Sequence, residues 1–251
     1  MLSSILTSRY LIELSYDGSK YNGWQKQPGQ PTVQGELEQA LSTIFRQEIT
    51  IMGSGRTDAG VHAEQQFAHF NLEPGGKVQP HLVLHSLRGL LPNDIYVINI
   101  KSVPQEYHAR FDAISRQYRY QFSTKHNVFQ NRYNWVKTGD FDALIVQKCA
   151  VLLIGEHDFG SFCKFNPDVN HTRCHVYSST FDIINEHTFH YRIHANRFLH
   201  HMVRSIVGNI VEVGLNRKSF AEFVDLLVNP DRSNSKVSAP AHALFLEKVL
   251  Y

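Results

Sequence analysis

Hydrophobic and polar positions alternate near the beginning of the chain, a period of two that is typical of a half-buried strand. The apolar positions of this segment are Tyr10, Ile12, Leu14 and Tyr16. After Pro31 the apolar spacing becomes three or four residues, which predicts a helix capped by Thr32. The pattern then predicts strands over 49–53 and 61–70, a helix over 82–91 and a strand over 95–103. This part of the chain therefore has the order βαββαβ.

A second series of elements begins near residue 104. It predicts a strand over 116–122, a helix over 141–154, a strand over 189–195, a helix over 198–214 and a last strand over 243–251. The second of these helices has an apolar stripe formed by Phe198, Met202, Ile206, Ile210 and Val213. We therefore expect two mixed halves, 1–104 and 105–251, in an α+β protein with predominantly antiparallel strands.

The composition is that of a globular protein. Of 251 residues 42% are apolar, and no apolar run approaches the length that spans a membrane. No basic residue precedes Arg9, so the beginning of the chain is unlike a signal peptide. Cys149, Cys163 and Cys174 are odd in number and match no Cys-x-x-Cys spacing, which favours free thiols and a cytoplasmic location.

The net charge of +2 conceals a basic and aromatic segment over 101–138. Its cations are Lys101, Arg110, Arg116, Arg119, Lys125, Arg132 and Lys137, against Glu106 and Asp112 as anions. Eight aromatic residues are interleaved with them. Cations neutralise phosphates and rings stack on exposed bases, so the segment suits a nucleic acid. A solvated basic face above an aromatic core explains the composition equally well.

Residues 53–63, Gly-Ser-Gly-Arg-Thr-Asp-Ala-Gly-Val-His-Ala, place opposite charges in a permissive stretch of backbone. A dinucleotide fingerprint is excluded because Asp58 stands where its third glycine belongs. A P-loop is excluded because Val61 and His62 follow Gly60 where Lys and Ser or Thr are required. His62-Ala63-Glu64 matches half of a zinc deaminase signature, but the Pro-Cys-x-x-Cys half is absent.

What remains is an acid at the end of a strand, immediately preceded by Arg56 and Thr57. A nearby arginine favours the ionised carboxylate, and an ionised carboxylate can attack carbon. A turn aspartate paired with a turn arginine is the structural alternative. The predicted helix over 198–214 offers a second source of positive charge, because Arg197, His201, Arg204 and Gly208 share one helical face.

Five segments in this order closely resemble the TruA family of tRNA pseudouridine synthases. They are YDGSKYNGWQKQ, GSGRTDAGVHA, YHARFDAISRQYRY, GEHDFGSFC and HHMVRSIVGNIVEVG. The resemblance extends from about Tyr10 to Tyr251 and implies two similar βαββαβ-like, ferredoxin-like halves. These halves would form a mixed, mainly antiparallel sheet with a central basic cleft. One departure is Ala243-Leu244, where family members usually carry Gly-Leu.

The resemblance also implies an isomerase that needs no metal and no organic cofactor and works as a homodimer. Its members convert uridines at positions 38, 39 and 40 of the tRNA anticodon stem-loop to pseudouridine. By matching motif, Asp58 is the expected nucleophile, and Tyr118 and Arg204 are the other expected catalytic residues. The expected substrate contacts are Arg56, Thr57, His62, Arg110 and Tyr118. Residues Tyr16, Asp17, Lys20, Tyr21 and Trp24 of the first loop could also grip the RNA.

Arg204 would hold the Asp58 acid ionised by lowering its pKa, whichever way that carboxylate acts. It could add to C6 of uracil, attack C1′ of the sugar or abstract a sugar proton, and the sequence leaves all three open. Two other functions also stay open. One is an RNA-binding protein that keeps the pocket without catalysis, and the other is the zinc deaminase.

Overall fold

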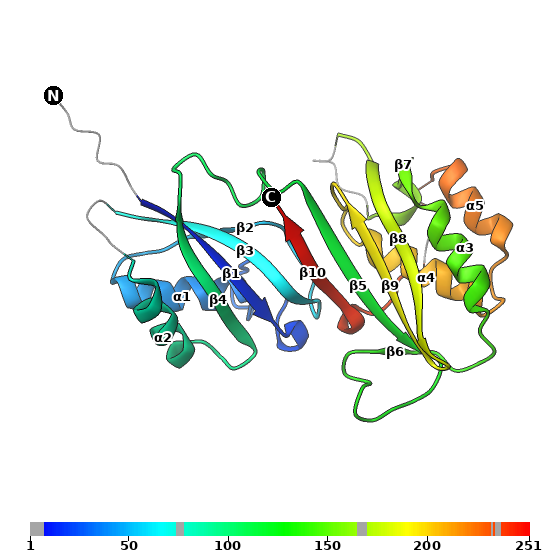
Figure 1. The fold of residues 1–251 in the computed structure, drawn as a ribbon, viewed down its shortest axis with the longest axis horizontal. Coiled ribbons are helices and arrows are strands. Elements are labelled where there is room, and N and C mark those ends of the chain that lie inside the picture. Colours follow the sequence, from blue (N-terminus) through cyan, green and yellow to red (C-terminus); the bar gives the residue numbers. More distant parts are fainter. Residues whose placement is uncertain (1–7, 74–77, 165–169, 232, 234–236) are drawn as a thin grey trace. The chain divides into compact units, whose positions relative to one another are not determined.

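The computed structural model describes residues 8–73, 78–164, 170–231, 233 and 237–251. The chain folds as two compact units. The first comprises residues 1–114 together with 248–251, and the second comprises residues 115–247. Each unit is an antiparallel sheet with helices packed against it, and the elements of both are labelled in Figure 1.

The first unit has the element order that the sequence pattern predicts. Its elements are β1 (Ser8–Tyr16), α1 (Val33–Phe45), β2 (Ile51–Gly53), β3 (His62–Leu72), α2 (Pro80–Leu90) and β4 (Ile95–Val103). β1 lies between β4 and β3, and β2 pairs with β3; all of these pairings are antiparallel. A short 3-10 turn, Gly18–Lys20, follows β1.

The core of this unit lies between the sheet and α1. Phe45 of α1 packs on Phe70 of β3 at a ring distance of 5.9 Å, and Phe70 stacks on Tyr10 of β1 at 5.6 Å. Leu37 and Leu41 of α1 are fully buried. Thr32 caps the helix as predicted, because its side chain accepts a hydrogen bond from the backbone N–H of Gly35.

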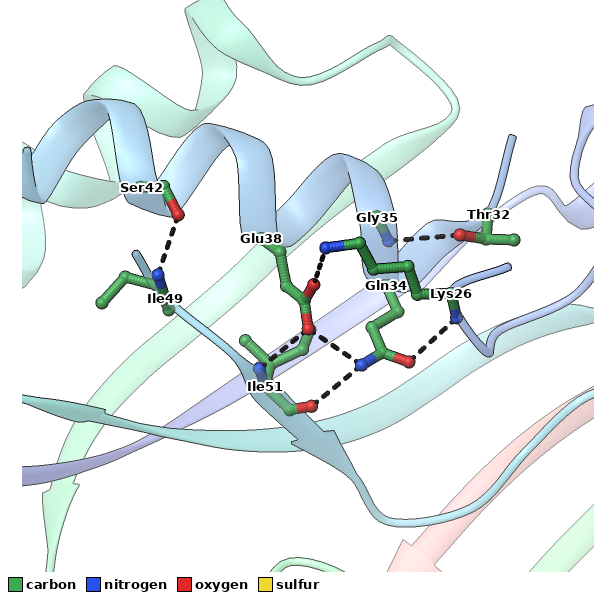
Figure 2. Close-up of polar contacts among 8 residues, drawn as sticks. All are labelled: Lys26, Thr32, Gln34, Gly35, Glu38, Ser42, Ile49 and Ile51. Carbon is green, nitrogen blue, oxygen red and sulfur yellow. Dashed lines mark hydrogen bonds and ion pairs between the residues drawn. The ribbon is translucent and has the colours of Figure 1, made fainter. Parts of the chain in front are cut away.

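A buried carboxylate ties α1 to the beginning of β2. Glu38 is 4% exposed, and its Oε1 accepts hydrogen bonds from the Gln34 side chain at 2.9 Å and the Ile51 backbone at 3.1 Å. Its Oε2 pairs with the Lys26 ammonium at 2.9 Å, and Gln34 also bonds the Ile51 carbonyl and the Lys26 N–H. Figure 2 shows these groups converging from three segments of the chain. Glu38 therefore fixes the strand that leads into the 53–63 segment.

The second unit repeats the strand and helix alternation with additional elements. These are β5 (Ser115–Ser123), β6 (Trp135–Val136), α3 (Ala143–Leu152), β7 (Gly155–Asp158), β8 (Arg173–Asn185), β9 (Thr188–Ala195), α4 (Met202–Gly214), α5 (Phe220–Val228) and the first part of β10 (Leu244–Leu250), whose residues from 248 on belong to the first unit. Short 3-10 turns cover Gly160–Phe162 and Ala241–Ala243. The strand order is β10-β5-β9-β8-β7, and the short β6 runs parallel to β5.

Aromatic side chains fill the space between this sheet and its helices. Phe122 of β5 packs on Phe141 at 4.9 Å and on Phe189 of β9 at 5.9 Å, and all three rings form one cluster with Phe181. Tyr120 is fully buried beside them. The predicted α+β class with mainly antiparallel strands is therefore confirmed in both units.

The beginning of α4 differs from the prediction. The helix begins at Met202, and the residue before it, His201, has a left-handed backbone with φ of 65°. Because that conformation interrupts a helix, Arg197 and Phe198 lie outside it. The predicted common helical face of Arg197, His201, Arg204 and Gly208 is therefore wrong for its first two members.

Ala243, which stands where the family usually has glycine, fits its position without backbone strain. It is fully buried at the end of the Ala241–Ala243 turn. The described non-glycine residues with positive φ are Arg46, His201 and Asn216, so Ala243 keeps an ordinary backbone conformation.

Among the described residues, none of the helices has the length and apolar character needed to cross a membrane.

Glu38→Ala should lower the free energy of unfolding by about 2 to 3 kcal/mol, because it strands the buried Ile51 N–H and leaves a cavity. Glu38→Gln keeps an acceptor of the same size and should cost about 1 kcal/mol. Lys26 is largely exposed, so losing its partner adds little. Urea denaturation checks both values.

Gln39→Ala is the matched control, because Gln39 is an exposed neighbour on the same helix. Its free energy of unfolding should stay within about 0.5 kcal/mol of the wild-type value. Equal losses in the Glu38→Ala and Gln39→Ala variants would contradict a structural role for the buried carboxylate.

Candidate functional site

The 53–61 segment forms a loop between β2 and β3, and hydrogen bonds to β3 hold its first half. The Ser54 N–H donates to the Phe67 carbonyl at 2.7 Å. The Gln66 amide donates to the Gly55 carbonyl at 3.1 Å and also accepts from the Ser54 hydroxyl. Ser54 and Gln66 are buried, so this end of the loop has little freedom.

The second half of the loop lies directly against the backbone of residues 21–24. The Trp24 N–H donates to the Thr57 carbonyl at 3.1 Å, and the Gly60 N–H donates to the Tyr21 carbonyl at 3.2 Å. At Gly23, where φ is +89°, a Cβ atom would lie 2.5 Å from the Thr57 oxygen. Only glycine allows this approach, so Gly23 sets the position of the backbone at Thr57 and Asp58.

Consecutive side chains of the loop have different environments. Arg56 is exposed, Thr57 is 7% exposed, and Asp58 is half-buried. The Thr57 hydroxyl forms a hydrogen bond of 2.8 Å with the Tyr16 hydroxyl, and the Asp58 carbonyl accepts from the Val61 N–H at 3.1 Å. Thr57 thus anchors the loop, while Arg56 and Asp58 on either side of it reach the surface.

His62, at the beginning of β3, is 1% exposed. Its Nδ1 accepts a hydrogen bond from the Gly18 N–H at 3.1 Å, so it connects β3 to the turn after β1. In this position His62 supports the backbone on which the loop rests.

The aromatic residues of the first loop are buried as well. Tyr16, Tyr21 and Trp24 are 5%, 6% and 2% exposed, and the Trp24 indole lies against Gly53. Their rings therefore hold the loop in place instead of offering stacking surfaces to RNA. Lys20 is exposed and pairs with Asp94 at 3.0 Å.

Arg110 lies in a different loop of the first unit, over residues 107–112. His69 of β3 holds this loop through a hydrogen bond to its backbone. The Ala109 N–H donates to His69 Nδ1 at 3.1 Å, and the Tyr251 hydroxyl donates to the Ala109 carbonyl at 2.7 Å. Burial, with help from the charge of Arg9, lowers the pKa of His69 to about 4. His69 is thus a neutral acceptor at pH 7, and Arg110 above it is exposed.

Tyr118 and Arg204 belong to the second unit. Tyr118 is half-buried on β5, and its ring meets Phe198 edge-on at 4.9 Å. Arg204 lies in the first turn of α4, where its Nε donates to the Ala239 carbonyl at 2.8 Å. Burial raises the pKa of Tyr120 well above its usual value, and the positive charge of Arg204 opposes that rise. Arg204 therefore lies near the strand that carries Tyr118 and Tyr120.

The first unit thus gathers Arg56, Thr57, Asp58 and His62 in one loop and the strand that follows it, with Arg110 on a separate loop. Sequence reasoning missed three residues that hold these loops in place, namely Gly23, Glu38 and His69. Gly23 has a signal in the sequence, since it is a glycine directly before a tryptophan in a predicted loop. Glu38 and His69 have none, because each acts through a contact with a distant segment.

Comparison with known proteins gives a consistent result. A sequence profile described as tRNA pseudouridine synthase matches residues 14–112 and 149–251. A protein of Porphyromonas gingivalis named tRNA pseudouridine synthase A is 39% identical over 245 residues, which is 97% of either chain. Proteins of the same name from Bacteroides fragilis and Thermosipho africanus are each 39% identical, over 97% of this chain and over 96% and 99% of their own lengths.

Gly23→Ala should destabilise the protein by at least about 2 kcal/mol, because it adds an overlap with the Thr57 carbonyl to the strain of a positive φ. Gly29→Ala is the matched control. Gly29 also has a positive φ, +70°, but a Cβ atom added there would have no described heavy atom within 4 Å. It should cost only about 1 kcal/mol. Thermal denaturation of the two variants measures the difference, and equal losses would contradict the close approach at Gly23.

Stability should also fall at acid pH because of His69. The unfolded chain binds a proton at His69 near pH 6.5, whereas the folded protein binds it only near pH 4, so stability falls as the pH drops through this window. The contribution lost between pH 7 and pH 5 is about 2 kcal/mol. His69→Asn places an amide oxygen near the Nδ1 position and cannot titrate. Urea denaturation at both pH values should therefore show a smaller loss in His69→Asn, and an identical loss would refute the role of His69.

Proposed function

The chain belongs to the tRNA pseudouridine synthase family, and from that membership we propose that it isomerises uridine to pseudouridine at positions 38, 39 and 40 of the tRNA anticodon stem-loop. The observation that carries the proposal is the Asp58 loop. It holds the half-buried Asp58 on a backbone that hydrogen bonds to β3 and to residues 21–24 fix on both sides. The reaction breaks the N1–C1′ bond, turns the uracil and joins C5 to the same sugar carbon, so no atom is gained or lost.

Asp58 is the proposed nucleophile. An ionised carboxylate can add to C6 of uracil, attack C1′ or remove a sugar proton, and each of these routes requires its oxygen at a defined place. The Trp24 N–H donates to the Thr57 carbonyl and the Gly60 N–H donates to the Tyr21 carbonyl, and these two hydrogen bonds restrict the Asp58 backbone. Mainly the side-chain torsions of Asp58 remain free to adjust. A group with so few degrees of freedom loses little entropy when it meets the substrate.

Arg56 and Tyr118 are proposed to handle the base. Uracil stacked in a stem must leave the helix before it can turn, at a cost of a few kcal/mol. Arg56 is exposed next to Asp58 and is proposed to occupy the vacated space or to hold the displaced base. Tyr118, half-buried against Phe198, is proposed to stack on the uracil and to take part in the later proton transfer.

Arg204 is proposed to pair with the Asp58 carboxylate in the working enzyme, and Thr57, His62 and Arg110 are proposed to support or contact the RNA. The proposed partner is tRNA, recognised mainly through its shape and its phosphates. A homodimer, cytoplasmic location, and chemistry without a metal or organic cofactor complete the proposal.

Asp58→Asn tests the central role. This variant should bind tRNA with an affinity within a few-fold of the wild type, because the substitution keeps the side-chain size and one acceptor oxygen and removes no cation that contacts phosphate. Its pseudouridine production should fall below about one thousandth of the wild-type rate, because the neutral amide is a poor nucleophile. Mass spectrometry of nuclease digests of the tRNA measures the product at each position.

Asp140→Asn is the control, because Asp140 is an exposed acid of the second unit outside the described contacts of the loop. It should leave product formation unchanged. Measurable turnover by a clean Asp58→Asn preparation would remove Asp58 as the nucleophile. A wild-type protein that binds tRNA and makes no pseudouridine would favour the RNA-binding protein without catalysis.

A further inference from the structure

A cavity of about 260 Å³ lies in the second unit, where the loop between β5 and β6 meets the turn between β8 and β9. Its lining is mixed, with amide, hydroxyl and imidazole groups beside aromatic rings. The residues are Gln121, Phe129, Gln130, Tyr133, Asn134, Ile184, Asn185, Thr188 and His190. All of them lie within 115–247, so the cavity belongs entirely to this unit.

Two polar atoms of the lining residues have no hydrogen-bond partner among the residues that the structure describes. Asn134 is 5% exposed and its Oδ1 is buried without a donor, although its backbone carbonyl accepts from His242 at 3.2 Å. The buried Nδ1 of His190 also has no partner. Burial, together with Arg119 and Arg192, lowers the pKa of His190, so its ring is neutral at pH 7. In native proteins nearly every buried polar atom has a hydrogen-bond partner, so each exception calls for an explanation such as a bound group.

The rim of the cavity combines rings with positive charge. Phe129 is 93% exposed, so its ring covers little of the protein's own core. The Arg132 guanidinium lies over the ring of the lining residue Tyr133 at 5.4 Å. These residues belong to the basic and aromatic segment over 101–138, whose composition is explained equally well by RNA contact and by ordinary packing. Phe129 and Tyr133 line the hollow, whereas Trp135 packs edge-on against the fully buried Tyr120 and Phe122 of β5.

We propose that this cavity binds an unstacked nucleobase of the RNA substrate. A base is planar and presents N–H donors at its edge, and Asn134 Oδ1, which can only accept, meets that edge once its buried side chain turns toward the cavity. The neutral His190 ring offers a second partner beside it, while Tyr133 or Phe129 supplies a stacking face. Arg132, beside the lining residue Tyr133, supplies the charge that a neighbouring phosphate requires. The assignment rests on the proposed function for the identity of the ligand as RNA.

The Asn134 side chain makes the proposal testable. If it serves only the fold, its replacement should leave RNA binding unchanged, and if it binds a base, its replacement should weaken RNA binding. Asn134→Leu removes the buried polar group and keeps a branched side chain of similar size. It should leave the melting temperature unchanged or raise it, since a buried unpaired acceptor destabilises the fold. If the acceptor serves a base, the same variant should also weaken RNA binding.

The experiment measures tRNA affinity by fluorescence anisotropy and steady-state pseudouridine formation with the full chain. Asn134→Leu and His190→Phe should each raise Kd and KM by about tenfold, the loss expected for one hydrogen bond to a bound base, with kcat within about twofold. Thr180→Val is the matched control, because Thr180 is an exposed polar residue of β8 outside the cavity lining. Its affinity and turnover should equal those of the wild type.

An Asn134→Leu variant with a raised melting temperature and unchanged tRNA affinity would overturn the proposal. A second outcome would also overturn it: the wild type binds free nucleoside monophosphates, Asn134→Leu abolishes that binding, and tRNA affinity stays the same. The site would then serve free nucleotides instead of RNA. If the wild type makes no pseudouridine but the two variants still lose tRNA affinity, the proposed function fails and the base site stands.

Discussion

The close approach of residues 22–24 to residues 57–59 determines where the Asp58 carboxylate lies. Neither segment is part of a strand, so their backbone groups satisfy one another: Trp24 donates to Thr57, and Gly60 donates to Tyr21. Gly23 makes this possible because it has no side chain to separate the two backbones. A loop of Gly, Ser, Thr and Ala would otherwise be mobile. Here these hydrogen bonds restrict it on both sides, which suits the nucleophilic role proposed for Asp58.

This contact depends in turn on buried polar groups further from the loop. The Glu38 carboxylate accepts hydrogen bonds from the Ile51 N–H and from the Gln34 side chain, which it thereby orients. The Gln34 oxygen in turn accepts from the backbone N–H of Lys26, two residues beyond Trp24. The Trp24 indole fills the space against Gly53, where β2 ends. An apolar residue at position 38 would bury as well but could not accept the Ile51 N–H. A carboxylate in the interior is therefore explained by the support it gives to β2 and to the first loop.

The regular elements could be predicted from the sequence, and the supporting contacts could not. Buried positions alternate from Ile12 to Tyr16 in β1 and over Ile95 and Val97 in β4, and α1 carries both its apolar spacing and its Thr32 cap, so local pattern identifies these elements. β8 was missed because register shifts near Val176 and Ile183 break its period of two. α4 begins later than predicted because His201 adopts a left-handed conformation that its apolar stripe does not reveal. The resemblance predicts Asp58 as the nucleophile, whereas the roles of Glu38 and His69 exist only once distant segments meet.

The second unit shows why an arginine, and not merely a positive charge, stands at position 204. Its Nε donates to the Ala239 carbonyl, and its own carbonyl accepts from the Ala239 N–H at 2.9 Å. The backbone bond holds residue 204 beside residue 239, and the Nε bond restricts the guanidinium plane, which limits the directions in which the terminal nitrogens lie. The neighbouring Pro240 carbonyl accepts from the Tyr120 hydroxyl at 2.9 Å, which ties this segment to β5. A lysine could supply the charge but has no Nε–H and no planar fork, so it could not present a carboxylate or phosphate with two aligned donors.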